Sequence, residues 1–227
     1  MTVRPEEVRQ MFDRISPGYD LMNRLMTAGL DGRWREWAVN AARIGPGDAA
    51  LDACCGTGDL AIELRRRVGP SGRVVGVDFS QSMLEIARRK SAGVEWRRGD
   101  ALELPFADGE FAAATVGWGI RNLSDRERGF AELARVVGPG GRVVCLEMST
   151  PPGWAARPAA MWTDHAVPVI GRLVTGDSEA YRYLPESTRR FPGAPELAGI
   201  MRDAGLRDVG FRRLMMGVVA IHVGTVA

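Results

Sequence analysis

The stretch from Ala50 to Ala61 constrains the fold of this chain more than any other part of the sequence. It reads Ala-Leu-Asp-Ala-Cys-Cys-Gly-Thr-Gly-Asp-Leu-Ala, so an apolar run ends near Asp52 and two closely spaced glycines follow. This pattern is typical of a buried strand, a tight turn and the start of a helix. Gly56 and Gly58 carry no Cβ, so a ligand can approach the backbone closely there. The first N–H groups of the helix point into the same space, and the stretch therefore predicts a ligand-binding turn.

After this turn, strand-like apolar runs alternate with helical ones. Strands are expected at 49–53, 73–78, 94–98, 111–116 and 142–148, with helices at 60–68, 82–90 and 125–137. Ser82 and Glu85 are expected to form a capping box at the start of the second helix. The glycine-rich run 138–141 is expected to be the turn after the third helix. The alternation predicts a doubly wound parallel sheet of the α/β class.

The segments on either side of this core have a different character. Helices are expected at 5–15, 19–28 and 31–42, and residues 1–45 would together form a helical lid on the core at 49–148. Residues 150–195 are too long for a plain loop and are expected to be an insertion that covers a substrate. The last part, 196–227, predicts a helix at 196–204 and a hairpin of strands 209–214 and 218–226. We expect one domain spanning 1–227.

Composition narrows the class of protein. The chain has 227 residues, which suits a single domain, and a net charge of +2, which gives no electrostatic reason to expect a nucleic acid partner. Cys54, Cys55 and Cys145 lack metal-ligand spacing, so buried thiols in the reducing cytoplasm are expected and no metal. No apolar run reaches the ~20 residues that cross a bilayer. We expect a soluble protein, or one attached to a membrane surface.

Two kinds of ligand suit the glycine turn. Residues 56–61 match the dinucleotide pattern G-x-G-x-x-G/A, and Asp78 ends the next strand, where an acid binds ribose hydroxyls. Asp52, however, would repel a pyrophosphate and would suit a cationic amine, such as that of S-adenosylmethionine. Both acids also have simpler explanations, since Asp52 could accept N–H groups of the turn and Asp78 could cap the following helix.

Two further strand ends complete the expected cofactor site. Asp100 follows the third strand and could accept the amino group of an adenine, with the Ala101 N–H meeting a ring nitrogen, although a solvent-facing loop would also suit it. Gly117 and Gly119 follow the fourth strand, where paired glycines favour close passage of a ligand. Ligands in such sheets bind outside the carboxyl ends of the strands, so the reacting groups are expected to meet there.

Several longer motifs carry a family resemblance. They are Tyr19-Asp20-Leu21-Met22-Asn23, the turn at 51–59, Gly119-Ile120-Arg121-Asn122, Pro139-Gly140-Gly141-Arg142, Tyr181-Arg182-Tyr183-Leu184-Pro185-Glu186-Ser187 and Gly217-Val218-Val219-Ala220. In these motifs the chain resembles the menaquinone and ubiquinone biosynthesis C-methyltransferase family. The resemblance implies a class I S-adenosylmethionine-dependent methyltransferase fold (Rossmann-like), with seven mostly parallel strands and an antiparallel last strand. It also implies S-adenosylmethionine as methyl donor and a polyprenylated quinol as acceptor.

The resemblance also assigns site residues. Cofactor contacts carry over to Thr57, Asp78, Asp100 and Ala101, and one falls on Gly117, where many members have Ser or Asn.

The reaction would methylate a ring carbon of a hydroquinone, which reacts once a neighbouring phenol, with a pKa of about 10, loses its proton. Arg121 is expected to stabilise the phenolate, unless it pairs with Asp125. His165 and His222 are the candidate bases, and Tyr19 is expected to line the quinol pocket with Asp20, Tyr181 and Tyr183.

The insertion is apolar enough to hold a prenyl tail, with its apolar residues at Trp154, Met161, Trp162, Val167, Val169 and Ile170, although the same residues could simply be core. If they form an exposed apolar groove, contact with a membrane surface is expected. The sequence leaves open whether demethylmenaquinol or a benzoquinol is methylated, and whether the chain forms a homodimer. It also leaves open an O- or N-methyltransferase of soluble substrates, a non-catalytic cofactor-binding module and a nicotinamide oxidoreductase.

Overall fold

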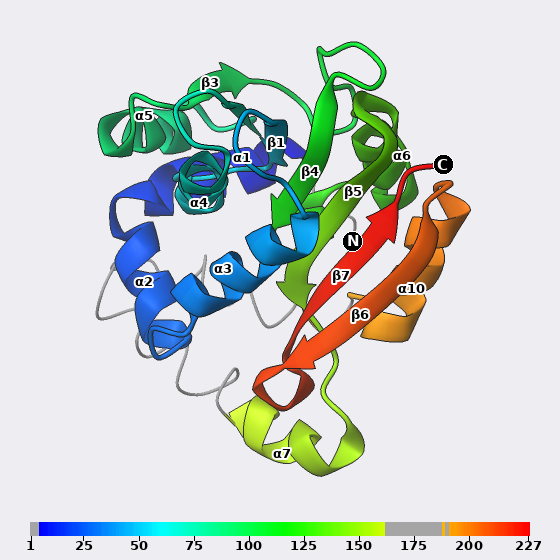
Figure 1. Ribbon diagram of the computed structural model, residues 1–227. Helices are drawn as coiled ribbons and strands as arrows, with labels where there is room; N and C mark the ends of the chain where they lie inside the picture. The colour runs from blue at the N-terminus through cyan, green and yellow to red at the C-terminus, as the bar shows by residue number, and fades with distance from the viewer. Residues whose placement is uncertain (1–4, 162–187, 189–190) are drawn as a thin grey trace.

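The computed structural model describes residues 5–161, 188 and 191–227, and within them the chain forms one twisted sheet (Figure 1). The strands are β1 Ala49–Ala53, β2 Arg73–Asp78, β3 Glu95–Arg98, β4 Phe111–Gly117, β5 Val137–Met148, β6 Arg207–Leu214 and β7 Val219–Thr225. Their order is β3-β2-β1-β4-β5-β7-β6. The first five are parallel, and β7 runs antiparallel to both β5 and β6. The predicted doubly wound sheet with an antiparallel last strand is confirmed.

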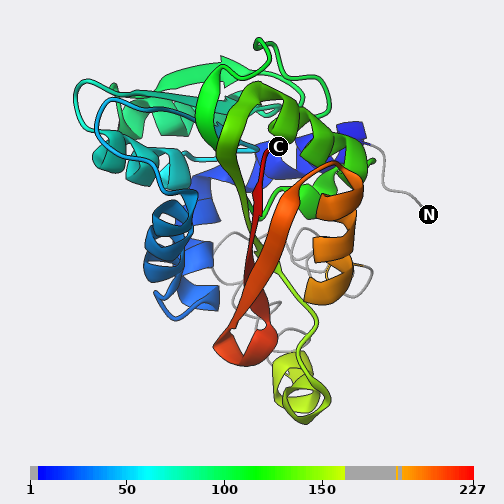
Figure 2. The same ribbon diagram turned by 45° about the vertical axis from the view of Figure 1, so that its right-hand side comes forward.

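Helices cover both faces of the sheet because its central strands are apolar on both sides (Figure 2). Helices α3 (Asp31–Ala42) and α4 (Asp59–Val68) share one core with β1, β2 and β5. Helices α6 (Arg126–Val136) and α10 (Ala194–Asp203) cover the other core. Helix α5 (Gln81–Lys90) packs against β2 and β3. No helix in the described ranges is both long and apolar enough to span a membrane.

Helices α1 (Pro5–Ile15) and α2 (Tyr19–Met26), joined by the short turn η1 (Ser16–Gly18), lie beside the carboxyl ends of β1 and β2. We call residues 5–26 the roof segment. Its buried face consists of Val8, Met11, Ile15 and Met22, at the spacing of an amphipathic helix. Of the insertion expected at 150–195, the structure describes α7 (Gly153–Met161) and a few flanking residues. His165, Tyr181 and Tyr183 lie outside the described residues.

Two local expectations are wrong. Ser80, not Ser82, caps α5, because its hydroxyl accepts the Met83 N–H at 3.2 Å. The run 138–141 is not a turn but the first part of β5, which begins by pairing Val137 with Phe111 and then shifts register. Glycine is needed in this run because a Cβ on Gly141 would lie 2.5 Å from the Ala112 carbonyl oxygen.

This close approach makes a prediction about stability. Gly141→Ala should lower the free energy of unfolding by about 1–3 kcal/mol, because the new methyl would push against backbone atoms of β4. Gly199→Ala is the matched control, since its Cβ would meet nothing within 4 Å inside α10. It should raise stability by up to about 1 kcal/mol. Urea unfolding followed by circular dichroism measures both, and equal effects of the two substitutions would contradict the prediction.

Candidate functional site

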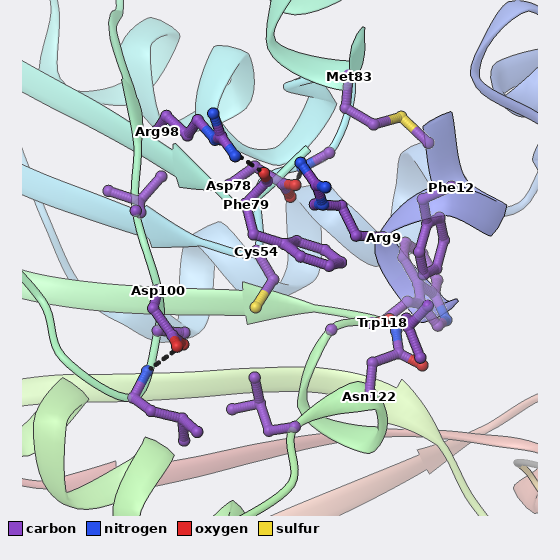
Figure 3. A pocket seen from close by; sticks show the side chains of 18 of the residues that line it. Arg9, Phe12, Cys54, Asp78, Phe79, Met83, Arg98, Asp100, Trp118 and Asn122 are labelled. Atoms are coloured by element: carbon purple, nitrogen blue, oxygen red, sulfur yellow. Dashed lines mark hydrogen bonds between the residues drawn. The ribbon is translucent and has the colours of Figure 1, made fainter. Parts of the chain in front are cut away.

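A cavity of about 620 Å³ opens at the carboxyl ends of β1, β2 and β4 (Figure 3). This is the place where the strand order reverses, since β1 has β2 on one side and β4 on the other, and open α/β sheets bind ligands at such points. Several parts of the chain line it: α1, the ends of β1 and β2, the loop after β3, and the end of β4 with η2 (Ile120–Asn122). Its size is in the usual range for small-molecule sites.

Asp78 forms the polar floor of the cavity. Its Oδ2 accepts the Gly56 N–H at 2.8 Å and its Oδ1 accepts the Ser80 N–H at 2.9 Å. Burial raises the pKa of this carboxyl to about 6, while the hydrogen bonds from the backbone oppose that rise. Gly56 has a φ of +53°, which glycine adopts without strain. The turn after β1 is therefore fixed by a side chain at the end of β2.

Asp52 is buried beneath the turn and does not line the cavity. Its Oδ1 accepts the Thr115 hydroxyl at 2.7 Å, and its Oδ2 has no hydrogen-bond partner. Burial raises the pKa of Asp52 to about 7. The sequence predicts that this carboxylate contacts a cationic ligand. In the structure it lies behind the cavity wall and does not reach the cavity.

The two residues after Gly56 do not line the cavity either. Gly58, with a φ of +87°, is needed for packing, because a Cβ there would lie 2.4 Å from Cη2 of Trp96. The Thr57 hydroxyl donates to Asp20 of the roof segment at 2.5 Å. Of the predicted cofactor residues, Asp52, Thr57 and Gly58 are thus outside the wall, while Gly56, Asp78, Asp100, Ala101 and Gly117 line it.

Asp100 lies on the opposite side of the cavity from the roof segment (Figure 3). Its Oδ1 accepts the Leu102 N–H at 2.9 Å, which fixes the loop after β3. The neighbouring Ala101 is buried against the core of the sheet. Gly117 lies at the end of β4, where a Cβ would come within 3.1 Å of the Leu60 side chain, so glycine allows close packing against α4 there.

The roof segment is held over the cavity by aromatic packing and by two carboxylates. Phe12 makes edge-to-face contacts with Tyr19 and Phe79, at centroid distances of 6.1 and 6.4 Å. Asp13 accepts the Ser80 hydroxyl at 2.6 Å. Asp20, which accepts the Thr57 hydroxyl, also pairs with Lys90. The roof segment is therefore attached to the turns that follow β1 and β2.

Tyr19 extends from the roof segment over the glycine turn, where its Cε1 lies 4.0 Å from the position of a Cβ on Gly56. Burial raises the pKa of the Tyr19 phenol, and the positive charge of Arg121 partly offsets this rise. The phenol therefore keeps its proton at neutral pH, and it can donate a hydrogen bond but cannot act as a base.

Arg121 forms a buried ion pair and does not itself line the cavity, although its neighbours Trp118, Gly119 and Asn122 do. Its Nη1 lies 2.7 Å from Oε1 of Glu147, and the two side chains are 7% and 0% exposed. The same nitrogen donates to the Trp118 carbonyl at 2.6 Å. Glu147, at the end of β5, also accepts the Met148 N–H at 2.8 Å. The alternative partner, Asp125, instead caps α6 by accepting the Arg128 N–H.

His222 is not positioned to act as the base. It is fully buried on the face covered by α10, where its Nε2 lies 3.0 Å from the Ala194 carbonyl oxygen. Its ring packs on Phe211, and burial lowers its pKa. It does not line the cavity. His165, the other candidate, lies outside the described residues, so its role stays a prediction.

The three cysteines are poor candidates for reactive or metal-binding groups. Burial raises the pKa of the Cys54, Cys55 and Cys145 thiols well above the usual value, so the thiolates that react or bind metals do not form at neutral pH. In the described part of the chain, no group of three or more His, Cys, Asp and Glu is arranged to hold a metal ion.

Sequence reasoning missed several residues of the site. Arg9 and Phe12 of α1 and Arg98 of β3 line the cavity (Figure 3). Glu147, which holds Arg121, was also missed. An acid inside the apolar run 143–148 is a signal that could have revealed it, because a buried carboxylate requires a partner.

Solved structures with the same fold confirm the architecture but do not fix the reaction. The crystal structure of the [4+2]-cyclase SpnF superposes with a TM-score of 0.72 at 18% identity, covering 98% of this chain and 96% of that one. An S-adenosylmethionine-dependent methyltransferase from Thermotoga maritima gives 0.68 at 21% identity, covering 96% and 98%. The fold is that of class I methyltransferases, and SpnF is named for a different activity.

Sequence relatives are much more similar. A demethylmenaquinone methyltransferase of Desulfitobacterium hafniense is 44% identical, over 96% of this chain and 88% of the relative. One from Thermus thermophilus is 46% identical, over 94% and 99%. The ubiquinone/menaquinone biosynthesis C-methyltransferase UbiE of Geobacter sulfurreducens is 40% identical, over 99% and 90%. The model of the ubiE/COQ5 methyltransferase family matches residues 1–226, and this chain, an enzyme that transfers methyl groups, belongs to that family.

Proposed function

We propose that this enzyme transfers a methyl group from S-adenosylmethionine to a ring carbon of a polyprenylated quinol, converting demethylmenaquinol to menaquinol. The observation that carries the proposal is the buried Arg121–Glu147 pair beside a cavity whose floor is Asp78. The relatives with the highest identities given above are named as demethylmenaquinone methyltransferases. The relative from Geobacter sulfurreducens is named for ubiquinone as well, so a benzoquinol is the second candidate acceptor.

The cavity suits S-adenosylmethionine. Asp78 offers carboxylate oxygens to a pair of ribose hydroxyls, next to the Gly56 backbone. Asp100, Ala101, Phe79 and Met83 all line the cavity, which supports a role for Asp100 as acceptor and the Ala101 N–H as donor to an adenine edge, with apolar surface for the ring from the other two. Asp52 lies beneath the turn and does not line this cavity. When bound, the cofactor supplies an electrophilic methyl group.

Arg121 has the charge that the acceptor needs. A quinol ring carbon becomes nucleophilic when the neighbouring hydroxyl gives its proton to water. After methyl transfer S-adenosylhomocysteine leaves, and the ring carbon loses its own proton to water. A guanidinium stays protonated at all working pH values. Arg121 therefore stabilises a phenolate electrostatically. Glu147 fixes the guanidinium by accepting both its Nη1–H and the Arg121 backbone N–H, at 2.7 and 3.3 Å. The Tyr19 phenol, which keeps its proton, donates a hydrogen bond to the same substrate oxygen.

Because a prenylated substrate resides in a membrane, we propose that the reaction takes place at the cytoplasmic surface of that membrane. An exposed apolar side chain such as Trp154 of α7, which is 73% exposed, is consistent with peripheral contact. A homodimer stays a prediction.

The identity of the acceptor is tested directly by product analysis. The enzyme is incubated with S-adenosylmethionine and either demethylmenaquinol or the demethylated benzoquinol, and the products are identified by mass spectrometry. We expect one added methyl on the ring of demethylmenaquinol and at least 10-fold slower reaction of the benzoquinol. Methylation of oxygen, or of soluble phenols alone, would instead support an O-methyltransferase of soluble substrates. Failure of every quinol to react would favour a non-catalytic binding module.

The role of Arg121 is separable from cofactor binding. Arg121→Ala should lower kcat by about 100-fold, the cost of removing one oxyanion-stabilising group, and should leave the dissociation constant of S-adenosylmethionine within about 2-fold. Glu147→Gln should lower kcat less, because the arginine keeps its charge but loses its fixed position. Arg66→Ala, on the outer face of α4, is the matched control and should react as the wild type. A wild-type kcat in Arg121→Ala would remove this residue from the mechanism.

Cofactor affinity should depend on the ionisation of Asp78. With a folded-state pKa of about 6, the carboxylate is fully formed at pH 8 and mostly protonated at pH 5. Only the ionised form can accept two ribose hydroxyls, so the affinity measured by calorimetry should fall about 10-fold from pH 8 to pH 5.

Two substitutions assign this dependence. Asp78→Asn should bind weakly and equally at both pH values, whereas Asp52→Asn should keep the 10-fold change because Asp52 lies outside the wall. If the pH dependence of the affinity disappears in Asp52→Asn, the titrating carboxylate is Asp52 and the prediction for Asp78 is wrong.

A further inference from the structure

A second cavity, of about 320 Å³, lies between α3 and the end of β6 with the following turn η4 (Met215–Gly217). Three arginines and no carboxylate line it. Its full lining is Leu30, Arg33, Trp34, Trp37, Arg212, Arg213, Leu214 and Met215. It shares no residue with the wall of the candidate site. We call it the arginine cleft.

The arginines of the cleft are held by aromatic rings. The guanidinium carbons of Arg33 and Arg212 lie 5.4 and 4.8 Å from the centre of the Trp37 ring. That of Arg213 lies 5.1 Å from the centre of Phe211. A guanidinium stacked on a ring keeps its N–H edges free for an anion, and its planar fork matches the oxygens of a phosphate.

The charge of the cleft is also uncompensated. Within the described ranges, no salt bridge involves any of these three arginines, whereas Arg73 and Arg135 each contact two carboxylates. A cluster of exposed positive charges without counter-ions attracts anions from solution. The chain as a whole carries a net charge of only +2, so this potential is local to the cleft.

Several segments near the cleft carry exposed apolar side chains. The end of α2, the start of α3, the turn η4 and α7 all lie at one end of the molecule, the lower end in Figure 1, and Figure 2 agrees. These segments carry Leu25, Leu30, Met216, Trp154 and Met161, which are 38–73% exposed. Large apolar side chains next to arginines and tryptophans are typical of surfaces that sit in the headgroup region of a bilayer.

We propose that this end of the molecule docks on a membrane, with the arginine cleft receiving phosphate groups of anionic phospholipids. A free phosphate would explain the arginines but not the apolar residues near them. A second copy of the chain across a two-fold axis would bring like charges together. A bilayer satisfies both features, because phosphates meet the guanidinium groups while the apolar side chains enter the region just below them.

The docked orientation also bears on the proposed function. It rests on that function in one respect, namely that the prenylated acceptor resides in the bilayer. Helix α3 separates the cleft from the candidate site. Arg33 and Trp37 face the cleft, while Arg35 stacks over Trp118 at 5.3 Å, and Trp118 lines the candidate site. The bilayer surface and the cavity that needs the quinol head are therefore one helix apart.

Vesicle flotation tests the docking without any reaction. Vesicles contain either phosphatidylglycerol and phosphatidylcholine in equal amounts or phosphatidylcholine alone, at 0.1 and 0.5 M NaCl. The wild type should float with the anionic vesicles, less so at high salt, and not with the neutral ones. The triple variant Arg33→Gln, Arg212→Gln, Arg213→Gln should bind anionic vesicles about 100-fold more weakly, or about 5-fold per arginine.

The control is the triple variant Arg66→Gln, Arg67→Gln, Arg89→Gln, which removes the same three positive charges from exposed positions of α4 and α5. It should float with anionic vesicles as the wild type does. Equal loss in both variants, equal binding to neutral vesicles, or no binding by the wild type would overturn the proposal. So would a wild-type dimer in sedimentation velocity that the cleft variant converts to a monomer. The wild type, the cleft variant and the control variant should all methylate a short-chain quinol in solution at the same rate. If none of them methylates it, the proposed function is contradicted but the docking proposal is not.

Discussion

The carboxylate of Asp78 is the interaction on which the site depends. It accepts the N–H of Gly56, which lies 22 residues earlier in the turn after β1, and the N–H of Ser80 in the turn after β2, and so fixes both turns. Burial opposes the ionised form and these two donors support it, which leaves the pKa of the group at about 6. A single side chain thus sets the shape of the glycine turn and gives the cavity floor its negative charge.

A second buried carboxylate, that of Glu147, likewise joins two segments of the chain, at the ends of β4 and β5. It binds Arg121, the Arg121 N–H and the Met148 N–H, so it joins η2 to the end of β5. An uncompensated buried charge is costly, whereas a paired and hydrogen-bonded one is tolerated. The pair orients a guanidinium at the place where β4 and β5 end, with its charge held by protein atoms rather than by water.

Much of this could be predicted from the sequence, because it depends on local pattern. The strands and helices follow hydrophobic periodicity, and Asp78, Asp100 and Gly117 follow from the rule that strand ends meet at one edge. The errors come from contacts between distant residues. Nothing local distinguishes Gly58, which packs under Trp96, from Gly56, which lines the cavity. Likewise, the hydroxyl of Thr57 donates a hydrogen bond to Asp20, 37 residues earlier, and not to a ligand as the sequence predicted.

The attachment of the roof segment has a consequence for how the protein opens. None of its residues belongs to either core of the sheet. Its contacts with the turns include Phe12 with Phe79, Asp13 with Ser80, and Asp20 with Thr57 and Lys90. Segments with few core contacts unfold locally at a lower free energy than the whole domain. Amide hydrogens of α1 and α2 will therefore exchange well before those of β1 and β4, and the cavity can fill and empty while the sheet stays folded.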